Sequence, residues 1–482
     1  MPSTISLLDA RPGVNFKLVT MTNWQPELNR QRGPIYRAIA DALALDIRAG
    51  RLPVGTRLPT HRDLAWNLKV TVGTVTRAYA EAERRGLISG EVGRGTYVRP
   101  LGTAPDLALR KEPLGPDFVD LSLNRPQTGE EPKLVAKGLR EIAESPELEE
   151  LIQYQPHAGR AIDRAAGARW IARGGIPADP ARVLVTQSGQ NAVASVLSAL
   201  TQPGDTVAVE SLTYPGVRSA ASLLNLRLAP VAMDDEGLLP ESFAALCRGG
   251  TVKALYTLPN LHNPTATVLS EERRRAVAEI AESHGVALVE DDVYGFLLEK
   301  PPTPLAALAP QRGYYITSTS KSLAPGLRIG YVQVPAEAME RVSAALRATI
   351  YMATPLMAAL ATRWIEDGTA DRLVAEKRAE AGERQRLART ILRGARVTGH
   401  PTATHVLLWL PEGWRAEAFE AAARRAGVGV TAATAFWLGR TSPPNAVRLC
   451  LGTPQRRADV ARALERIAAL LARPAESYLS VI

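Results

Sequence analysis

From about residue 180 onward, short runs rich in apolar and β-branched residues alternate with longer stretches of helical character. This alternation favours a mostly parallel sheet, because parallel strands need a crossover connection that is usually a helix. Ligands bind such sheets at the carboxyl ends of the strands, so we expect functional side chains there. The expected strands are residues 182–186, 206–210, 252–258, 286–290 and 314–317, and the expected helices are residues 190–200 and 270–283.

Charge is distributed unevenly along the 482 residues, a length that allows more than one domain. The chain carries 58 Lys+Arg and 49 Asp+Glu, a net charge of +9. Residues 1–100 hold 15 basic and 8 acidic residues, net +7, so the rest is nearly neutral. A basic module indicates binding to a polyanion such as nucleic acid, although a solvated basic surface gives the same count.

Residues 34–98 predict three short helices followed by a hairpin. Pro34 suits the start of the first helix, and Thr60 and Thr71 are suitable N-caps for the second and third. Two strands around a glycine-rich turn are expected within residues 87–98. The predicted buried positions are Ile35, Ile39, Leu43 and Ile47 in the first helix, Leu64, Ala65 and Leu68 in the second, and Val75, Ala78, Tyr79 and Ala82 in the third.

Three motifs in this region, at residues 57–65, 74–79 and 93–98, resemble those of a GntR-type winged helix-turn-helix DNA-binding domain. The resemblance implies that the partner is double-stranded DNA and that the third helix enters its major groove. The alternative is a winged helix used only for protein contacts. The implied base readers are Thr71, Thr74 and Arg77, the implied phosphate or groove contacts are Arg57, Arg62 and Arg94, and His61 is a further candidate.

A proline-containing segment without an apolar period follows the hairpin and is typical of a semi-rigid linker. We therefore predict a DNA-binding domain at residues 21–100, a linker at 101–117 and a large C-terminal domain at 118–482. The first 20 residues show no sustained period, and Met21 is an alternative start of the functional chain.

Two candidate chemical groups follow predicted strands of the large domain. Lys321 lies among hydroxyl residues after strand 314–317, and Arg328 follows in a loop with Pro and Gly. This pairing suits a Schiff-base lysine beside a phosphate-binding guanidinium, whereas a lone lysine would be a surface residue. Asp291 ends strand 286–290, where a carboxylate can keep a pyridine nitrogen protonated, and Tyr294 can reach the ring hydroxyl. Alternatively, an acidic pair there caps a helix.

Three further positions add weaker signals. Ser188, Gly189 and Gln190 lie between a strand and a helix, where free backbone N–H groups favour a phosphate. Asn263 follows strand 252–258, although Asn-Pro marks a turn in any case. Tyr214 precedes Pro-Gly and could stack on an aromatic ring or simply pack.

Taken together, these motifs resemble the fold-type-I aminotransferases that use pyridoxal 5′-phosphate, over residues 118–482. The resemblance implies an α/β domain in which Lys321 forms the internal aldimine and Asp291 pairs with the pyridine nitrogen. Asn263 and Tyr294 would bind the ring oxygen, and Tyr214 would stack on the ring. The implied phosphate ligands are Ser188, Gly189, Gln190, Ser318, Arg328 and, from the other subunit of a homodimer, Tyr154. Arg448 resembles the arginine that holds the substrate carboxylate.

The chain as a whole resembles the MocR family, in which a GntR-type head is fused to an aminotransferase-like body. The resemblance implies a multidomain regulator whose body senses an amino compound, or pyridoxal phosphate itself, and alters DNA binding. The alternatives are an active aminotransferase with an accessory head and a cofactor-free scaffold.

The sequence also bears on the compartment. The two cysteines, Cys247 and Cys450, have neither a disulfide framework nor metal-ligand spacing. No apolar run approaches a membrane span, and the N-terminus lacks the features of a signal peptide. We expect a cytoplasmic protein without a metal site.

Overall fold

The computed structural model describes residues 24–26, 34–48, 51–52, 56–84, 87–91, 95–98, 115, 117–439 and 443–472. The chain divides into two compact units, Met1–Thr103 and Ala104–Ile482, which we describe one at a time. None of the helices within these described residues is long and apolar enough to cross a membrane.

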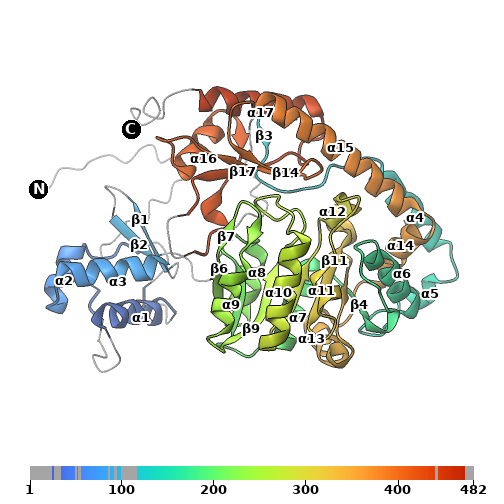
Figure 1. The fold of residues 1–482 in the computed structure, drawn as a ribbon, viewed down its shortest axis with the longest axis horizontal. Helices are drawn as coiled ribbons and strands as arrows, with labels where there is room; N and C mark the ends of the chain where they lie inside the picture. The colour runs from blue at the N-terminus through green and yellow to red at the C-terminus, as the bar shows by residue number, and fades with distance from the viewer. Residues whose placement is uncertain are drawn as a thin grey trace, which may run out of the picture. The chain divides into compact units, whose positions relative to one another are not determined.

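The N-terminal unit contains three helices and an antiparallel hairpin, in the predicted order (Figure 1). Thr60 caps the second helix, since its Oγ1 accepts a hydrogen bond from the Asp63 backbone N–H at 3.2 Å. Thr71 Oγ1 accepts from the Thr74 backbone N–H at the same distance and caps the third. The elements are α1 (Ile35–Arg48), α2 (His61–Leu68), α3 (Val72–Arg84), β1 (Ile88–Glu91) and β2 (Gly95–Val98).

The apolar faces of these helices form one core. All the predicted core positions of α2 and α3 are buried, and they pack with Ile39, Leu43 and Ile47 of α1. Ile35 is the exception, because it is 36% exposed. As the first residue of α1 it lies at the end of the helix, and the buried face begins one turn later at Ile39.

The C-terminal unit is built on a seven-stranded sheet that is parallel except for one strand (Figure 1). All the strands predicted from the alternation lie in this sheet. The sequence did not predict two others, one of which contains Pro230 and the other of which begins at Gly330. The order is β4 (Val183–Thr186), β12 (Gly330–Gln333), β11 (Gly313–Ser318), β10 (Ala287–Asp291), β9 (Val252–Thr257), β5 (Thr206–Glu210) and β6 (Arg227–Val231), with β12 antiparallel to both of its neighbours.

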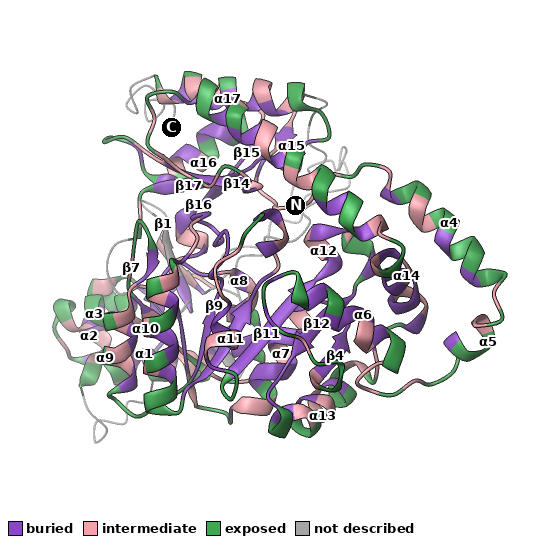
Figure 2. Ribbon diagram, turned by 45° about the vertical axis from the view of Figure 1, so that its right-hand side comes forward, coloured by how far each residue is buried: buried purple, intermediate pink, exposed green. Residues whose placement is uncertain are grey.

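Helices cover both faces of this sheet, so its strands are buried (Figure 2). Val207 and Val209 of β5 pack in one core with α7 and α13, whereas Ala208 packs in another with α9 and α10. The covering helices are α6 (Ala161–Ala172), α7 (Gly189–Leu200), α8 (Pro215–Leu223), α9 (Pro240–Cys247), α10 (Glu271–His284), α11 (Leu305–Leu308), α13 (Met339–Ile350) and α14 (Pro355–Glu366). The same unit also contains α4 (Glu131–Ala143) and the short elements α5 (Leu148–Leu151), α12 (Thr319–Ser322), β7 (Met233–Asp234) and β8 (Gly237–Leu238).

A long helix, α15 (Thr369–Ile391), connects this sheet to a smaller one in the same unit (Figure 1). The smaller sheet has the order β13, β14, β17, β16, and a separate short pair joins β15 to β3 in parallel. The elements are β13 (Val397–Thr398), β14 (His405–Trp409), β16 (Thr431–Ala432), β17 (Ala446–Cys450), β15 (Val428–Gly429), β3 (Val119–Asp120), α16 (Ala416–Arg425) and α17 (Arg457–Leu471).

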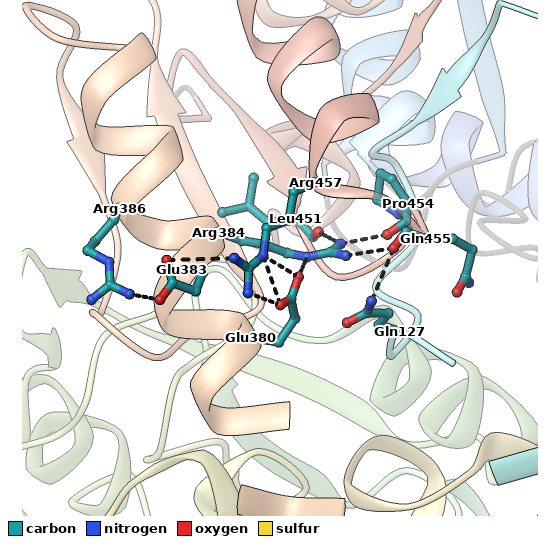
Figure 3. A network of polar contacts seen from close by, with 9 residues as sticks. All are labelled: Gln127, Glu380, Glu383, Arg384, Arg386, Leu451, Pro454, Gln455 and Arg457. Carbon is teal, nitrogen blue, oxygen red and sulfur yellow. Dashed lines mark hydrogen bonds and ion pairs between the residues drawn. The ribbon is translucent and has the colours of Figure 1, made fainter. Parts of the chain in front are cut away.

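A polar network connects α15 to the loop that follows β17 (Figure 3). Arg384 of α15 is 1% exposed, donates to the Leu451 carbonyl at 2.6 Å and pairs with Glu380 at 2.7 Å. Arg457, at the start of α17, binds the same Glu380 carboxylate at 2.5 Å. Because β17 carries Arg448, this network stabilises the position of the predicted carboxylate-binding strand.

Candidate functional site

The residues predicted for cofactor and substrate, except Tyr154, line one cavity of about 570 Å³ in the C-terminal unit. Most of them follow the carboxyl ends of strands in the large sheet, as expected for a parallel arrangement. The predicted residues at the cavity are Ser188, Gly189, Gln190, Tyr214, Asn263, Asp291, Tyr294, Ser318, Lys321, Arg328 and Arg448.

Lys321 lies in the short helix α12, directly after β11. The Oγ of Ser318 caps this turn by accepting from the Ser320 backbone N–H at 3.2 Å. The Lys321 amine donates a hydrogen bond to the backbone carbonyl of Asn124. Burial, together with the positive charge of Arg448, lowers the pKa of Lys321 to about 8. A fraction of the amine is therefore unprotonated near neutral pH, as a nucleophile requires.

Asp291 is the last residue of β10 and is 4% exposed. Its Oδ2 accepts a hydrogen bond from the Tyr256 hydroxyl at 2.7 Å. Its Oδ1 is buried and has no hydrogen-bond partner in the described part of the chain. Burial raises the pKa of Asp291 to about 7. A cationic N–H group in the cavity would both satisfy Oδ1 and restore the charge of the carboxylate.

Arg448 in β17 is 3% exposed and holds a positive charge in the cavity wall. Its Nη1 donates to Asn263 Oδ1 at 2.8 Å, and its Nη2 donates to the Ser122 carbonyl. The guanidinium lies over the Phe436 ring, 4.7 Å from the centroid. Both of these hydrogen-bond acceptors are neutral oxygens, and Nε has no hydrogen-bond partner among the described residues. A buried cation of this kind suits a bound anion such as a carboxylate.

An anion-binding end is built around the start of α7, a helix of 12 residues. Ser188 caps it by accepting from the Asn191 backbone N–H at 3.1 Å, which leaves the N–H groups of Gly189 and Gln190 at the helix terminus. Arg328, which is exposed, and Ser318 line the same cavity. The helix dipole, the hydroxyl and the guanidinium together favour a phosphate.

Two tyrosines complete the lining. Tyr294 is 4% exposed, and its hydroxyl accepts a hydrogen bond from Asn124 Nδ2 at 3.1 Å. Tyr214 directly precedes α8. Burial raises the pKa of both phenols, so both remain protonated at neutral pH.

Tyr154 lies outside the cavity. It is 82% exposed, and its ring lies 5.2 Å from that of Tyr351. Its role toward a second subunit therefore stays a prediction.

Sequence reasoning missed Asn124, Tyr256 and His405, which contact the predicted residues. Asn124 is 197 residues from Lys321 along the chain, and no local pattern marks it. Tyr256 lies inside a predicted strand next to the one that ends at Asp291, so register alone could have indicated it. The sequence analysis also did not name Arg125, which lines the cavity.

In the N-terminal unit, the predicted base readers gather at the start of α3. Thr71 and Arg77 are exposed, and Thr74 is half-buried. The hydroxyl oxygens of Thr71 and Thr74 are 2.9 Å apart. Arg62 is exposed on α2. Thr71, Arg77 and Arg62 are therefore accessible to a partner, although the hydroxyl of Thr71 already accepts the capping hydrogen bond.

The other DNA-binding candidates differ in their surroundings. The ring of His61 packs edge-on against Tyr79, with centroids 5.0 Å apart. Arg57 forms an isolated β-bridge with Tyr97 of β2. Arg94 lies outside the described residues.

The fold and the cavity define the C-terminal unit as an aminotransferase-type α/β domain. Residues 116–467 match the family "Aminotransferase class I and II", and residues 35–98 match "Bacterial regulatory proteins, gntR family".

Curated relatives combine both parts. The uncharacterized HTH-type transcriptional regulator YdeF of Bacillus subtilis (strain 168) is 33% identical over 450 residues, 93% of this chain and 97% of that protein. The vitamin B6 salvage pathway transcriptional repressor PtsJ of Salmonella typhimurium is 27% identical over 87% of this chain and 95% of its own length. The chain belongs to the family of HTH-type transcriptional regulators that join a gntR-family region to an aminotransferase class I and II domain, the arrangement of the MocR type.

Solved structures share the fold of the C-terminal unit. Kynurenine aminotransferase of Pyrococcus horikoshii superposes with a TM-score of 0.67 at 24% identity, covering 74% of this chain and 91% of its own. A double mutant of Thermus thermophilus aspartate aminotransferase has a TM-score of 0.64 at 26% identity, covering 74% and 92%.

The residues present fit pyridoxal 5′-phosphate, the cofactor that this family implies. The unpartnered Oδ1 of Asp291 suits a protonated ring nitrogen, and the start of α7 suits the phosphate. Lys321 supplies an amine of lowered pKa at the same cavity.

Proposed function

We propose that this protein is a DNA-binding transcriptional regulator that carries pyridoxal 5′-phosphate and responds to an amino compound through Lys321. One observation carries the proposal. The same chain holds a winged helix-turn-helix with an accessible third helix and a cavity that keeps an amine, a buried acid with a free oxygen and a buried arginine. We propose the boundaries 21–100, 101–117 and 118–482 for head, linker and body.

The cofactor, when bound, supplies an aldehyde that condenses reversibly with primary amines. In the cavity, Lys321 would present the resident amine, and Asp291 would keep the ring nitrogen protonated. Asn263 and Tyr294 would bind the ring oxygen, and Tyr214 would pack on the ring. Ser188, Gly189, Gln190, Ser318 and Arg328, around the start of α7, would hold the phosphate.

The effector would be an amino compound that condenses with the same aldehyde as Lys321. Arg448 would bind its carboxylate, since this guanidinium is buried and bonds an amide oxygen and a backbone carbonyl, both of them neutral. An effector shifts DNA binding only if it binds two states of the protein with different affinity, so its occupancy must change the body.

We propose a homodimer in which Tyr154 reaches the phosphate of the partner subunit. The exposure of Tyr154, together with Ile152 at 65% and Tyr351 at 48%, supports a contact surface there. A dimer would also present two heads to a DNA site with two half-sites. Because the target is genomic DNA, we place the protein in the bacterial cytoplasm.

An active aminotransferase is the second candidate, favoured by the fact that all the implied cavity residues are in place. It predicts many turnovers when the loaded protein is incubated with amino acids and a 2-oxo acid. A regulator predicts at most slow conversion.

The test is selection of genomic fragments by the loaded protein at physiological salt with competitor DNA, with and without a pool of amino acids. We expect one upstream region whose recovery the pool alters. Arg448→Ala should lose the response to carboxylated compounds while its visible absorbance band remains. A protein that selects no fragment and turns over amino acids would replace the regulator by the enzyme.

A further inference from the structure

Two residues outside the implied set, Asn124 and His405, lie beside the groups that carry protons in the cavity. Asn124 contacts the Tyr294 hydroxyl through its side chain and the Lys321 amine through its backbone carbonyl, and His405 contacts Asn124 and the Tyr294 ring. We propose that they position the Tyr294 hydroxyl hydrogen and the Lys321 amine, and that His405 does so as a neutral imidazole held in one tautomer. The test by cofactor absorbance rests on the proposed function.

The amide of Asn124 is bonded on every side. Its Oδ1 accepts from Thr404 Oγ1 at 3.1 Å. Its Nδ2 lies 3.1 Å from the Tyr294 hydroxyl and 3.2 Å from His405 Nδ1, one contact for each amide hydrogen. Its backbone carbonyl accepts from Lys321. One residue therefore touches both the phenol and the amine.

The partners of His405 determine its tautomer. Its Nε2 lies 3.0 Å from the His262 backbone carbonyl, which can only accept, so Nε2 carries a hydrogen. Its Nδ1 faces the Asn124 amide N–H and must accept. A second ring hydrogen would point at this donor.

The surroundings keep His405 uncharged. It is fully buried, and burial together with the charges of Arg448 and Lys321 lowers its pKa to about 3. The neighbouring His262 is also buried with a lowered pKa, so it adds no competing charge at neutral pH. Tyr294, whose ring centroid is 5.7 Å from that of His405, keeps its proton.

This arrangement orients the phenol. Because the Tyr294 oxygen already accepts from Asn124, its own hydrogen is available to an acceptor in the cavity that Tyr294 lines. Without the Asn124 amide, His405 Nδ1 would lose its donor, and the nearby phenol would become its replacement. The hydrogen of Tyr294 would then turn away from the cavity.

The first experiment follows visible absorbance of the pyridoxal phosphate-loaded protein against pH. A hydrogen bond from Tyr294 to the ring oxygen draws off negative charge and lowers the proton affinity of the nitrogen that joins Lys321 to the cofactor. Tyr294→Phe should therefore raise the pH midpoint, by about one unit or more. Asn124→Ala should raise it similarly, and the double variant should shift no further than Tyr294→Phe alone.

A rescue separates positioning from general damage. His405→Leu in the Asn124→Ala background removes the competing acceptor, so the midpoint should return toward that of the parent. His400→Asn, at a histidine that contacts Thr402, is the matched control and should leave the midpoint unchanged. Additive shifts for Asn124→Ala and Tyr294→Phe would overturn the proposal. So would a pH midpoint that does not return toward that of the parent when His405→Leu is added to Asn124→Ala.

A second readout needs no cofactor. Histidine-selective ¹⁵N NMR of the full chain, assigned with His405→Asn, should show a protonated Nε2 and an unprotonated Nδ1 from pH 5 to 8. Protonation of His405 within this range would refute the neutral tautomer. A parent protein without a cofactor band that still shows this tautomer would refute the proposed cofactor, but not the arrangement of Asn124 and His405.

Discussion

Asp291 illustrates at the residue scale how burial and partners determine the chemistry of one carboxyl group. Tyr256 satisfies one oxygen, and the other has no partner among the described residues. The raised pKa of Asp291 is therefore a property of the cofactor-free cavity, and a cationic N–H donor would reverse it.

This pKa predicts a pH-dependent stability. Because the pKa of Asp291 rises from 3.8 to about 7 on folding, the folded chain binds the proton more tightly than the unfolded chain. Its contribution to the free energy of unfolding therefore falls as pH rises from about 4 to about 7. Asp291→Asn should remove this loss, making the cofactor-free variant more stable than the parent by an amount that grows across this range to a few kcal/mol, on the order expected for such a shift.

Urea unfolding of both cofactor-free proteins at pH 4.5 and pH 7.5 measures this difference. A difference that does not change with pH would mean that the carboxyl group titrates as it does in the unfolded chain.

At the scale of elements, the close approach of β12 to the start of α7 shapes the proposed phosphate end. A Cβ on Gly330 would lie 2.6 Å from Thr186 Oγ1 and 2.8 Å from the carbonyl carbon of Ser188. Only glycine fits at position 330, because the antiparallel pairing of β12 with β4 places this residue opposite Thr186.

Gly330→Ala should therefore push β12 away from the turn that holds Ser188 and Gly189. We expect a loss of about 1–3 kcal/mol in the free energy of unfolding, as for an overpacked core, and weaker binding of pyridoxal phosphate. Gly326→Ala is the matched control, since a methyl group added at Gly326 would have nothing within 4 Å of it. Chemical unfolding and absorbance titration measure both effects, and equal behaviour of the two variants would contradict the steric argument.

At the scale of the whole molecule, most of the excess of basic over acidic residues belongs to the N-terminal part, and the cavity belongs to the C-terminal part. DNA affinity and ligand affinity should therefore respond to different substitutions, although an effector links them in the proposed regulator.

Arg62→Ala tests the electrostatic part of DNA binding. We expect weaker binding to all sequences and a salt slope smaller by about one, because one phosphate contact is lost. Arg37→Ala, at an exposed arginine of α1, should leave the slope unchanged. Fluorescence anisotropy at several salt concentrations measures the slope. Loss of preference at a single base, with an unchanged slope, would show that Arg62 reads sequence instead.

The sequence by itself determined five strands of the large sheet, the helices and hairpin of the N-terminal unit, and the functional residues at strand ends, but not β6 or β12. Capping residues, apolar spacing and β-rich runs are local patterns, and they predicted α2, α3 and the strands that precede Asp291 and Lys321. Local periodicity failed at Ile35, because a helix end can carry the right spacing and still lie outside the core.

Only the tertiary structure decided which distant residues complete the cavity. Asn124 meets Lys321 across 197 residues and His405 across 281, and Arg448 meets Asn263 across 185. Hydrogen bonds of this kind depend on how the two sheets and the segment after β3 come together in space. No pattern along the chain encodes such a distance, so a side chain whose role is to hold another one becomes visible only in the fold.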